Sequence, residues 1–334
     1  MANLTIRDIA RMAGVSTTAV SFVINNRKGV STATRQKVQE IIQRTGFTPN
    51  VHTRRLNLGR SYTVQVVLSH HDANLYNQFA METLNSIFTV SKSLGYSVTL
   101  TFADGSLDVE QIMDAVRNKD CDGVILIQLS DPTIISQLQK DNIPFVCVDV
   151  HTDLAVPQVG LDYYDATYQA TIQLHQMGHT KIGFIGTGSP GVYHRNTFGG
   201  YAAAMKDAGL NYDPAWLCEV AFSETSAEAC VQKLLKLPEL PTAFLCAGDV
   251  FAVNLLRYAR QYGLRIPEDV SLMSLDDLLI SQYVDPPLST MTFPKELLGE
   301  KAMRLLYQIL QGENYERVNL IKTSPVMRGT VKQL

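Results

Sequence analysis

Apolar positions over residues 5–46 recur at the spacing of three short amphipathic helices. Each of these helices has a hydroxyl side chain placed to cap its start, and the first and third have a glycine placed to end them. The expected caps are Thr5, which fits a capping box with Asp8, then Ser16, and Ser31 or Thr32; the expected ends are Gly14 and Gly46. The pattern predicts a small all-α domain whose core holds Ile6, Ile9, Ala10, Ala13, Val20, Val23, Ile24, Val38, Ile41 and Ile42.

Short apolar runs typical of buried strands alternate with amphipathic stretches typical of helices from residue 62 onward. The apolar runs lie at 64–68, 96–102, 123–127, 145–148, 181–185, 242–246 and 270–275. Such alternation predicts parallel sheets covered by helices on both faces. Because about 270 residues exceed one such unit, we expect two lobes that divide near Leu161, with residues 289–311 crossing back to the first lobe.

Basic and acidic side chains are divided unevenly along the chain. Residues 1–60 hold ten basic and two acidic side chains, whereas the remaining residues hold 19 basic and 30 acidic ones. A polyanion is therefore attracted to the first part of the chain and repelled by the second. Charge alone leaves open a solvated basic surface that has no partner.

Bulk composition narrows the class of protein further. No apolar run approaches the roughly 18 residues of a membrane span, and the start of the chain lacks the apolar segment of a secretory signal. The five cysteines are scattered and never spaced Cys-x-x-Cys, which argues against disulfides and a zinc site. We therefore expect a protein of the reducing cytoplasm that has no membrane partner.

The second predicted helix has a polar face suited to the major groove of DNA. Thr18, Ser21, Phe22 and Asn25 follow helical spacing, and Thr17 lies beside them. Hydroxyl and amide side chains offer the hydrogen bonds that base edges and phosphates accept or donate. Phe22 has two readings, contact with a thymine methyl group or packing against the first helix. For the whole domain, the alternative to DNA binding is a helical bundle that contacts another protein.

Several motifs along the chain belong to one pattern. The first is Thr5-Ile-Arg-Asp-Ile-Ala-Arg-Met-Ala-Gly-Val-Ser-Thr-Thr-Ala-Val-Ser21, and the others span 30–35, 46–50, 174–185, 263–271, 276–277 and 286–290. Together they resemble the lactose/galactose repressor (LacI/GalR) family over nearly the whole chain. The resemblance implies an α/β two-lobed, periplasmic-binding-protein-like (type I) sensor domain behind an N-terminal all-α helix-turn-helix domain.

The resemblance also divides the chain into segments with separate roles. A helix-turn-helix domain is expected over 1–49, and a hinge helix with its linker over 50–61. The first lobe of the effector-binding domain takes 62–161 and 291–318, and the second takes 162–290 and 319–334. The implied protein is a homodimer, with a tetramer left open, that binds double-stranded operator DNA. A small-molecule effector of carbohydrate type is expected between the lobes.

The hinge carries a candidate wedge for the minor groove. Leu56 matches the leucine with which the family opens a base step, and an apolar residue beside Arg54 and Arg55 has no core nearby. The expected DNA contacts are Thr5, Ser16, Thr17, Thr18, Ser21, Phe22, Asn25, Ser31, Asn50, Arg54 and Leu56. Phe22 departs from the family, because many members carry a guanine-reading Arg at this position, so the usual operator sequence is not assumed.

The carboxyl ends of the predicted strands identify candidate effector contacts, since ligands of open α/β sheets bind there. The resemblance assigns this role to Asn77, Phe79, Asp149, Arg195, Phe222 and Asp276. Three positions depart from the sugar-binding pattern. Gly248 and Tyr163 stand where Asn is frequent, and His151 lies near a frequent Arg.

Signals for other chemistry are weaker. Gly186-Thr-Gly-Ser-Pro-Gly191 is a literal dinucleotide-binding motif, but Asp207, the acid at the right distance, falls in a predicted helix. The run at 70–72 (His-His-Asp) lacks a third metal ligand, and the pair at 276–277 lacks a nearby nucleophile. We therefore expect a transcriptional regulator, a repressor, with no catalytic residues, cofactor or metal. A solute-binding protein without a regulatory role is the alternative, followed by a nucleotide-dependent enzyme.

Overall fold

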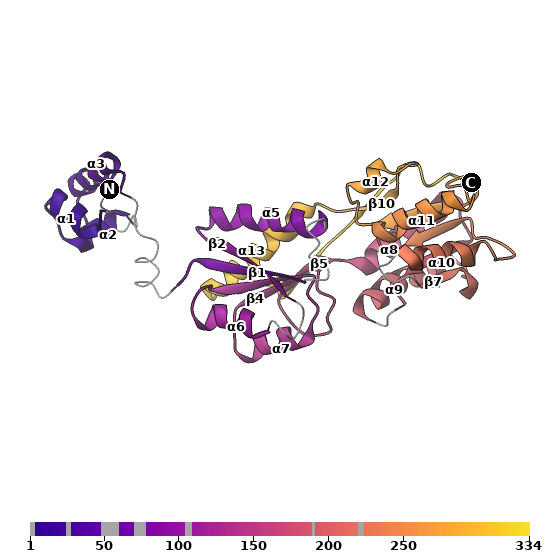
Figure 1. Cartoon of the computed structure of the whole chain (residues 1–334), viewed down its shortest axis with the longest axis horizontal. Helices are drawn as coiled ribbons and strands as arrows, with labels where there is room; N and C mark the ends of the chain where they lie inside the picture. Colours follow the sequence, from indigo (N-terminus) through magenta and orange to yellow (C-terminus); the bar gives the residue numbers. More distant parts are fainter. Residues whose placement is uncertain are drawn as a thin grey trace. The chain divides into compact units, whose positions relative to one another are not determined.

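A computed structural model describes residues 4–24, 28–47, 60–69, 78–103, 109–188, 191–219 and 224–334. The chain divides into two compact units, an N-terminal unit of Met1–Tyr62 and a C-terminal unit of Thr63–Leu334. Figure 1 shows both units, coloured along the sequence. Within the described part of the chain, we find no helix with both the length and the apolar character of a membrane span.

The N-terminal unit contains the three predicted helices, α1 (Ile6–Ala13), α2 (Thr17–Ile24) and α3 (Thr32–Thr45). Their caps are confirmed. The Thr5 hydroxyl accepts a hydrogen bond from the backbone N–H of Asp8 at 3.4 Å, while the Thr5 N–H donates to the Asp8 carboxylate at 3.0 Å. Ser16 accepts from the N–H of Ala19 at 3.1 Å, and Ser31 accepts from that of Thr34 at 3.2 Å, which settles the third cap on Ser31.

A small apolar core holds these three helices together. Ile9, Val20 and Val38, one from each helix, have no exposed surface. Gly14 and Gly46 end α1 and α3 in the left-handed conformation that glycine adopts without steric cost. The predicted core positions Ile6, Ile24 and Ile42 are partly buried and pack at its edge. Burial of these aliphatic side chains fixes which face of α2 is left to solvent.

The first lobe of the C-terminal unit is built on a parallel sheet of six strands in the order β11-β5-β4-β3-β1-β2. Helices α5 and α13 cover one face, and α6 and α7 cover the other (Figure 1). The elements are β1 (Thr63–Ser69), α5 (Gln78–Ser93), β2 (Ser97–Ala103), α6 (Val109–Arg117), β3 (Gly123–Ile127), α7 (Pro132–Lys140), β4 (Phe145–Val148), β5 (Gln158–Leu161), α13 (Lys295–Gln311) and β11 (Val318–Ile321). The buried central strands are continuous apolar runs, as two-sided burial requires.

The second lobe repeats this plan with a sheet in the order β12-β10-β9-β8-β6-β7. Its strand pairs are parallel except β10 with β12. Its elements are α8 (Tyr163–Gln176), β6 (Ile182–Gly186), α9 (Val192–Asp207), a 3₁₀ turn (Pro214–Trp216), β7 (Leu217–Glu219), α10 (Glu224–Leu234), β8 (Ala243–Cys246), α11 (Asp249–Gln261), β9 (Ser271–Leu275), α12 (Ile280–Tyr283), β10 (Ser289–Thr292) and β12 (Ser324–Val326).

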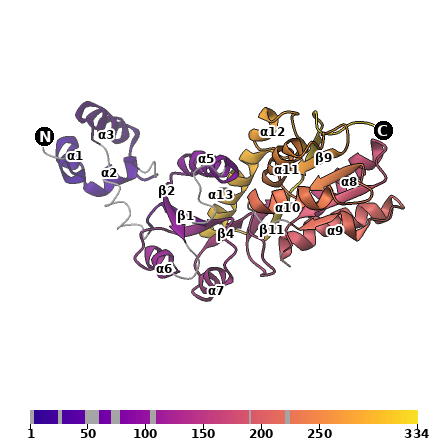
Figure 2. The same cartoon turned by 45° about the vertical axis from the view of Figure 1, so that its right-hand side comes forward.

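The chain passes between the two sheets three times. Figure 2 shows α13, coloured late in the sequence, beside α5 of the first lobe. The expected return crossings were 290/291 and 318/319. In the structure, β10 stays in the second sheet to Thr292, and β11 pairs with β5 of the first sheet to Ile321. The difference of a few residues arises because backbone pairing between strands sets each crossing, and the apolar pattern alone does not show which strand pairs with which.

Two helix pairs approach each other through glycines. A Cβ atom on Gly299 of α13 would lie 2.8 Å from the Cβ of Ser86 in α5. A Cβ atom on Gly200 of α9 would lie 2.9 Å from the carbonyl carbon of Tyr164 in α8. Neither distance leaves room for a side chain, so both glycines set how closely their helices pack.

Candidate functional site

The solvent-facing start of α2 carries polar side chains. Ser16, Thr17 and Thr18 are exposed, while Val20 and Val23 of the same helix are buried in the core. Ser21 is half-buried. The other predicted contacts in this unit, Thr5 and Ser31, are also exposed, and both cap a helix start. These hydroxyl groups therefore lie beside helix N-termini, where phosphate oxygens are attracted.

Phe22 packs against the loop that follows α2. Gly29 in that loop has a φ of +122°, and a Cβ atom placed on it would lie 2.9 Å from Cε2 of the Phe22 ring. The ring is half-buried, so one part of it rests on Gly29 and another part faces solvent. The structure thus adds this glycine loop as a packing partner of the ring, besides the two partners suggested by the sequence, the first helix and DNA.

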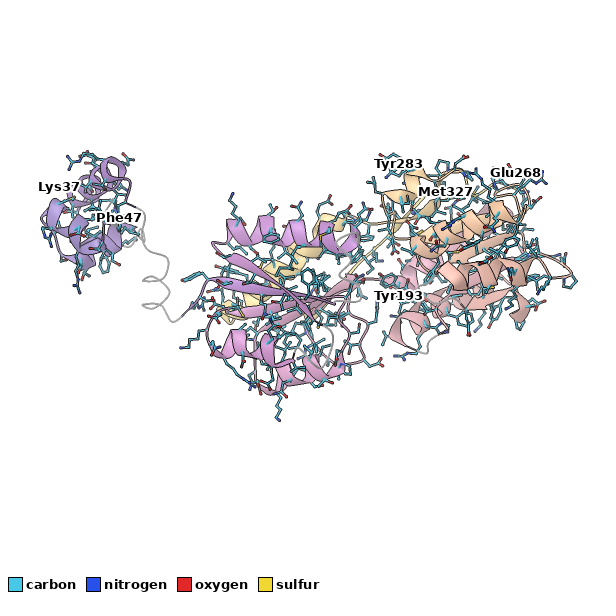
Figure 3. All side chains as sticks on the ribbon, in the orientation of Figure 1. Lys37, Phe47, Tyr193, Glu268, Tyr283 and Met327 are labelled. Carbon is cyan, nitrogen blue, oxygen red and sulfur yellow. The ribbon has the colours of Figure 1, made fainter. Side chains whose placement is uncertain are left out.

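The N-terminal unit also exposes basic side chains. Arg7, Lys37 and Arg44 are exposed, and the side chain of Arg11 keeps 80% of its surface exposed although it pairs with Asp8 at 3.4 Å. Figure 3 labels Lys37 on α3, together with the core residue Phe47. Four of the expected DNA contacts, namely Asn25, Asn50, Arg54 and Leu56, lie outside the described residues.

A second candidate site lies at the carboxyl end of β4 in the first lobe. Asp149 follows this strand with a φ of +51° and is 3% exposed. Its Oδ2 accepts hydrogen bonds from Nε2 of Gln128 at 3.1 Å and from the hydroxyl of Tyr163 at 3.2 Å. Its Oδ1 is buried and has no hydrogen-bond partner. A buried carboxylate oxygen without a hydrogen-bond donor destabilises the folded state, because its lost hydration is not replaced.

Three aromatic rings from both lobes pack around this carboxylate. His151 of the first lobe lies 5.4 Å from Tyr163 and 4.8 Å from Tyr193, measured between ring centroids, and the two tyrosines are 4.9 Å apart. Tyr163 begins α8, and Tyr193 stands in the first turn of α9, where its hydroxyl donates to the carbonyl oxygen of Ala247 at 3.0 Å. Figure 3 labels Tyr193 at the side of the second lobe that faces the first.

A further carboxylate reaches the same place from the second lobe. Asp276 follows β9 with a φ of +100°, and its N–H donates to the carbonyl oxygen of Met291 at 3.0 Å. Burial, together with the negative charges of Asp249 and Asp149, raises the pKa of Asp276 to about 8. Burial, together with the negative charges of Asp149 and Asp276, also raises the pKa values of Tyr163 and Tyr193. The predicted residues Asp149 and Asp276 are thus brought together; with Asp249 we call them the acid cluster.

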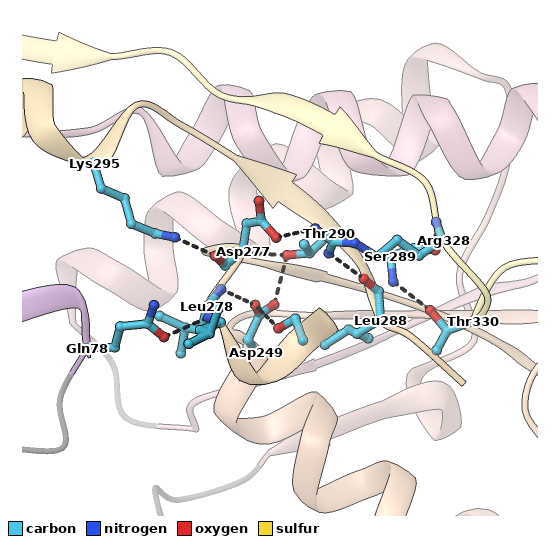
Figure 4. Close-up of polar contacts among 12 residues, drawn as sticks. Gln78, Asp249, Asp277, Leu278, Leu288, Ser289, Thr290, Lys295, Arg328 and Thr330 are labelled. Carbon is cyan, nitrogen blue, oxygen red and sulfur yellow. Dashed lines mark hydrogen bonds and ion pairs between the residues drawn. The ribbon is translucent and has the colours of Figure 1, made fainter. Parts of the chain in front are cut away.

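Asp249 holds the loop that carries Asp276 (Figure 4). It is fully buried at the start of α11 and accepts hydrogen bonds from the N–H of Leu278 and the hydroxyl of Thr290, both at 2.8 Å, and from the hydroxyl of Ser281. Burial raises the pKa of Asp249, while these hydrogen bonds act in the opposite direction. Asp249 is not among the effector contacts predicted above, and the structure gives it a positioning role.

Asp277 lies in the same set of polar contacts, and its N–H donates to the hydroxyl of Thr290 at 3.3 Å (Figure 4). Its carboxylate accepts from Nη2 of Arg328 at 2.6 Å in an ion pair whose side chains are only 17% and 13% exposed. The Nζ of Lys295 donates to the backbone carbonyl of Asp277 and lies 3.7 Å from the carboxylate of Glu82. The two adjacent aspartates therefore differ in role, since Asp277 is neutralised and Asp276 is not paired with Arg328.

The structure describes two of the other four predicted effector contacts. Phe79 is 5% exposed and packs in the core, with its ring 5.8 Å from that of Phe293. Arg195 is exposed, and its guanidinium pairs with Asp153 of the first lobe at 2.5 Å. Asn77 and Phe222 lie outside the described residues. The sequence had not assigned Tyr193 or Gln128, and the only signal available for them was their place just after strand ends.

The glycine motif after β6 does not have dinucleotide-binding geometry. Asp207 is the last residue of α9 and accepts a hydrogen bond from Tyr168, rather than ending a second strand. A Cβ atom on Gly188 would lie 2.5 Å from the carboxylate of Glu219, and this negative charge opposes a pyrophosphate. Among the residues described here, no group of three or more metal-binding side chains is found, and the run at 70–72 lies outside them.

Known proteins resemble this chain along nearly its full length. The "HTH-type transcriptional repressor PurR" of Aliivibrio salmonicida (strain LFI1238) is 30% identical over 322 residues, which are 94% of each chain. The "HTH-type transcriptional repressor CytR" of Escherichia coli (strain K12) is 29% identical over 99% of this chain and 97% of its own.

Solved structures agree in fold. The lac repressor dimer bound to operator and the anti-inducer ONPF has a TM-score of 0.80 at 26% identity and covers 99% of this chain and all of its own. The complex of the transcriptional regulator CelR with cellobiose has a TM-score of 0.73 at 28% identity over 98% of this chain and 100% of its own. Residues 171–331 match the periplasmic binding protein-like domain, and residues 5–50 match the lacI family of bacterial regulatory proteins. With a relative of 30% identity along 94% of its length, the chain belongs to the lacI family of bacterial regulatory proteins.

Proposed function

We propose that this chain is a transcriptional repressor whose affinity for a double-stranded DNA operator is controlled by a small molecule. The observation that carries the proposal is the exposed hydroxyl-rich start of α2 on a basic three-helix unit, in a chain that matches repressors from end to end. A helix of this kind enters the major groove with its N-terminal residues at the base edges. Thr17, Thr18 and Ser21 contact bases or phosphates in this proposal, and Phe22 contacts a base from its exposed side.

Two further groups complete the proposed DNA interface. Thr5, Ser16 and Ser31 contact phosphates from the helix starts that they cap, where the helix dipole favours negative charge. From the sequence alone, Asn25 extends the reading face, Asn50 and Arg54 contact the hinge region of the operator, and Leu56 opens a base step in the minor groove. Binding by a homodimer places two such units on a pseudopalindrome.

The proposed effector is a sugar or sugar derivative held between the lobes by Asp149 and Asp276. Support comes from the contacts that already join the lobes at this place, among them the bond from Tyr163 to Asp149. The CelR structure carries cellobiose, and two-lobed domains of this type bind ligands at the strand ends. Arg195 contacts the effector if its pair with Asp153 opens, and Phe79 acts from the core behind the site. Asn77 and Phe222 complete the proposed contacts from sequence alone.

Effector control follows from how the lobes are joined. A ligand that contacts both lobes favours one arrangement of them, and the change reaches the DNA-binding unit through the segment before β1. A coupling free energy of about 1–3 kcal/mol changes operator affinity by roughly 5- to 150-fold. In this proposal the chain works in the cytoplasm and carries out no catalysis.

DNA footprinting with the purified full-length chain tests the proposal. We expect protection of a pseudopalindromic site at protein concentrations that leave unrelated DNA unprotected. The double substitution of Thr17→Ala and Thr18→Ala should weaken this site by about tenfold or more, since each lost base contact costs about 1–3 kcal/mol. Gln43→Ala, at an exposed position of α3, should change little and serves as the matched control. Equal affinity for all DNA sequences would refute the proposal.

A further inference from the structure

The acid cluster contains more carboxylates than its surroundings neutralise. Asp149, Asp249 and Asp276 approach from β4, α11 and β9, and the pKa of Asp276 near 8 reflects burial and the charges of the other two. The other titratable groups facing Asp276 are Tyr163, Tyr193 and Lys295. Of these only Lys295 is a cation, and its Nζ is engaged by the Asp277 carbonyl and by Glu82.

The cations near the lobe junction are committed to other acids. Arg195 pairs with the exposed Asp153, and Arg328 pairs with Asp277. Among the described residues, neither arginine forms an ion pair with Asp149 or Asp276, and Asp249 is satisfied by neutral hydroxyl and N–H donors. Within the part of the chain that the structure describes, no cation is thus paired with Asp149 or Asp276, and one buried oxygen of the site, Oδ1 of Asp149, has no donor.

The aromatic rings beside the cluster strengthen the preference for a cation. His151, Tyr163 and Tyr193 pack within 5.4 Å of one another between centroids, next to the Asp149 carboxylate. Aromatic faces attract ammonium groups and also stack on the apolar faces of sugar rings. A ligand that offers an ammonium group on a sugar ring meets both demands.

We propose that the effector is an amino sugar in its protonated form, whose ammonium group is held by Asp149 and Asp276 beside the rings of His151, Tyr163 and Tyr193. This inference rests on the proposed function and names the chemical class of its effector. The ammonium group supplies the donor that Oδ1 of Asp149 lacks and the positive charge that the cluster lacks. A neutral sugar supplies only the first, and a sugar phosphate brings a charge that the cluster repels.

Binding measurements on the full-length chain at pH 7 test the class of ligand. Glucosamine, galactosamine and mannosamine are compared with their parent hexoses, their N-acetyl derivatives and the hexose 6-phosphates, by thermal shift and by calorimetry. At least one amine should bind about ten- to hundredfold more tightly than its parent and its N-acetyl derivative, because a charge-assisted bond replaces a neutral one. The inference is overturned if no amine binds, or if a neutral or phosphorylated sugar binds as tightly as its amine.

Two isosteric variants test which residues cause the preference for the amino sugar. Asp149→Asn and Asp276→Asn should each remove the preference for the amine, whereas Asp114→Asn, an exposed carboxylate on α6, should retain it. A preference that survives both site variants overturns the assignment. Gel-shift assays without sugar check that each variant still binds its operator, so a failure of the proposed function is seen separately from a failure of this inference.

The wild-type chain provides a readout that does not depend on a variant. At pH 7 a carboxyl group with a pKa of about 8 is mostly protonated, and an ammonium group bound to it favours the carboxylate. Amine binding should therefore release up to roughly 0.9 proton per site, measured by calorimetry in buffers of different ionisation enthalpy. Binding of the amine with no proton release would overturn the contact with Asp276.

Discussion

Substitution of Gly200 by alanine tests whether the close packing of α9 on α8, the helices that carry Tyr193 and Tyr163, is a structural constraint. A Cβ atom at position 200 would lie 2.9 Å from the carbonyl carbon of Tyr164 and closer still to its oxygen. A backbone carbonyl cannot rotate away, so the two helices must separate. Tyr163 and Tyr193, which stand in the first turns of these helices, would move with them. Gly199 is the matched control, since a Cβ atom there would lie 3.4 Å from the Tyr164 ring, an ordinary contact.

The expected magnitude combines two opposing effects. Replacing a helical glycine by alanine stabilises the helix by about 0.5–1 kcal/mol, and overpacking a tight contact costs about 1–3 kcal/mol or more. Because the clash at position 200 is with backbone, we expect the upper part of that cost and a net loss of about 2 kcal/mol for Gly200→Ala. Gly199→Ala should be neutral or gain up to about 1 kcal/mol.

Urea unfolding followed by tryptophan fluorescence measures both variants. Trp216 is the one tryptophan in the sequence and is 9% exposed in the core of the second lobe, so its emission reports on the lobe that contains both glycines. A loss of about 2 kcal/mol lowers the midpoint by about 0.7 M at a slope near 3 kcal/mol per M. If Gly200→Ala unfolds at the same midpoint as Gly199→Ala, the close approach of α8 and α9 is not a structural constraint.

Three further predictions concern separate parts of the chain. Asp276 has a pKa of about 8 when folded against 3.8 when unfolded, so the native chain holds a proton that the unfolded chain loses, and wild-type stability falls as pH rises through this window. The free energy of unfolding of Asp276→Asn, measured by urea melts, should therefore increase relative to that of wild type by about 1–2 kcal/mol between pH 5 and pH 7; this magnitude allows for the partial exposure of the side chain. If the difference in unfolding free energy between variant and wild type is the same at both pH values, the raised pKa of Asp276 is contradicted. Arg328→Met leaves the nearly buried Asp277 unpaired and should cost about 2–4 kcal/mol, and the reasoning fails if the same melts show less than about 1 kcal/mol. Leu56→Ala should weaken operator binding far more than non-specific DNA binding in a salt-matched titration, and an equal loss in both would exclude a wedge.

Local chemistry in the sequence was sufficient to predict the N-terminal unit. Thr5, Ser16 and Ser31 cap the helices as expected, and Gly14 and Gly46 end them. Caps and glycine ends depend on neighbours within four residues along the chain, so the sequence contains all the information that they need. The solvent-facing position of Thr17 and Thr18 follows from the same pattern, because the apolar side of α2 has only one core to face.

Contacts across the lobes could not be predicted in the same way. Asp149 and Asp276 are separated by more than a hundred residues, and the pattern of either segment is compatible with an ordinary polar loop. The structure also places Arg195, on α9, against Asp153 and buries Phe79, on α5, against Phe293. A strand end determines which edge of the sheet a residue occupies, but the partner of its side chain depends on what the other lobe presents.

The sequence by itself determined the basic helical unit, the alternation of strands and helices, and which residues end the strands, because periodicity, charge and capping are local properties. Only the tertiary structure decided which strand ends meet. It left Oδ1 of Asp149 buried without a donor, satisfied Asp249 with Thr290 and the N–H of Leu278, and separated Asp276 from its neighbour Asp277. These outcomes depend on strand pairing and on the packing of one lobe against the other, and the free energies of such long-range contacts are not encoded in any short segment.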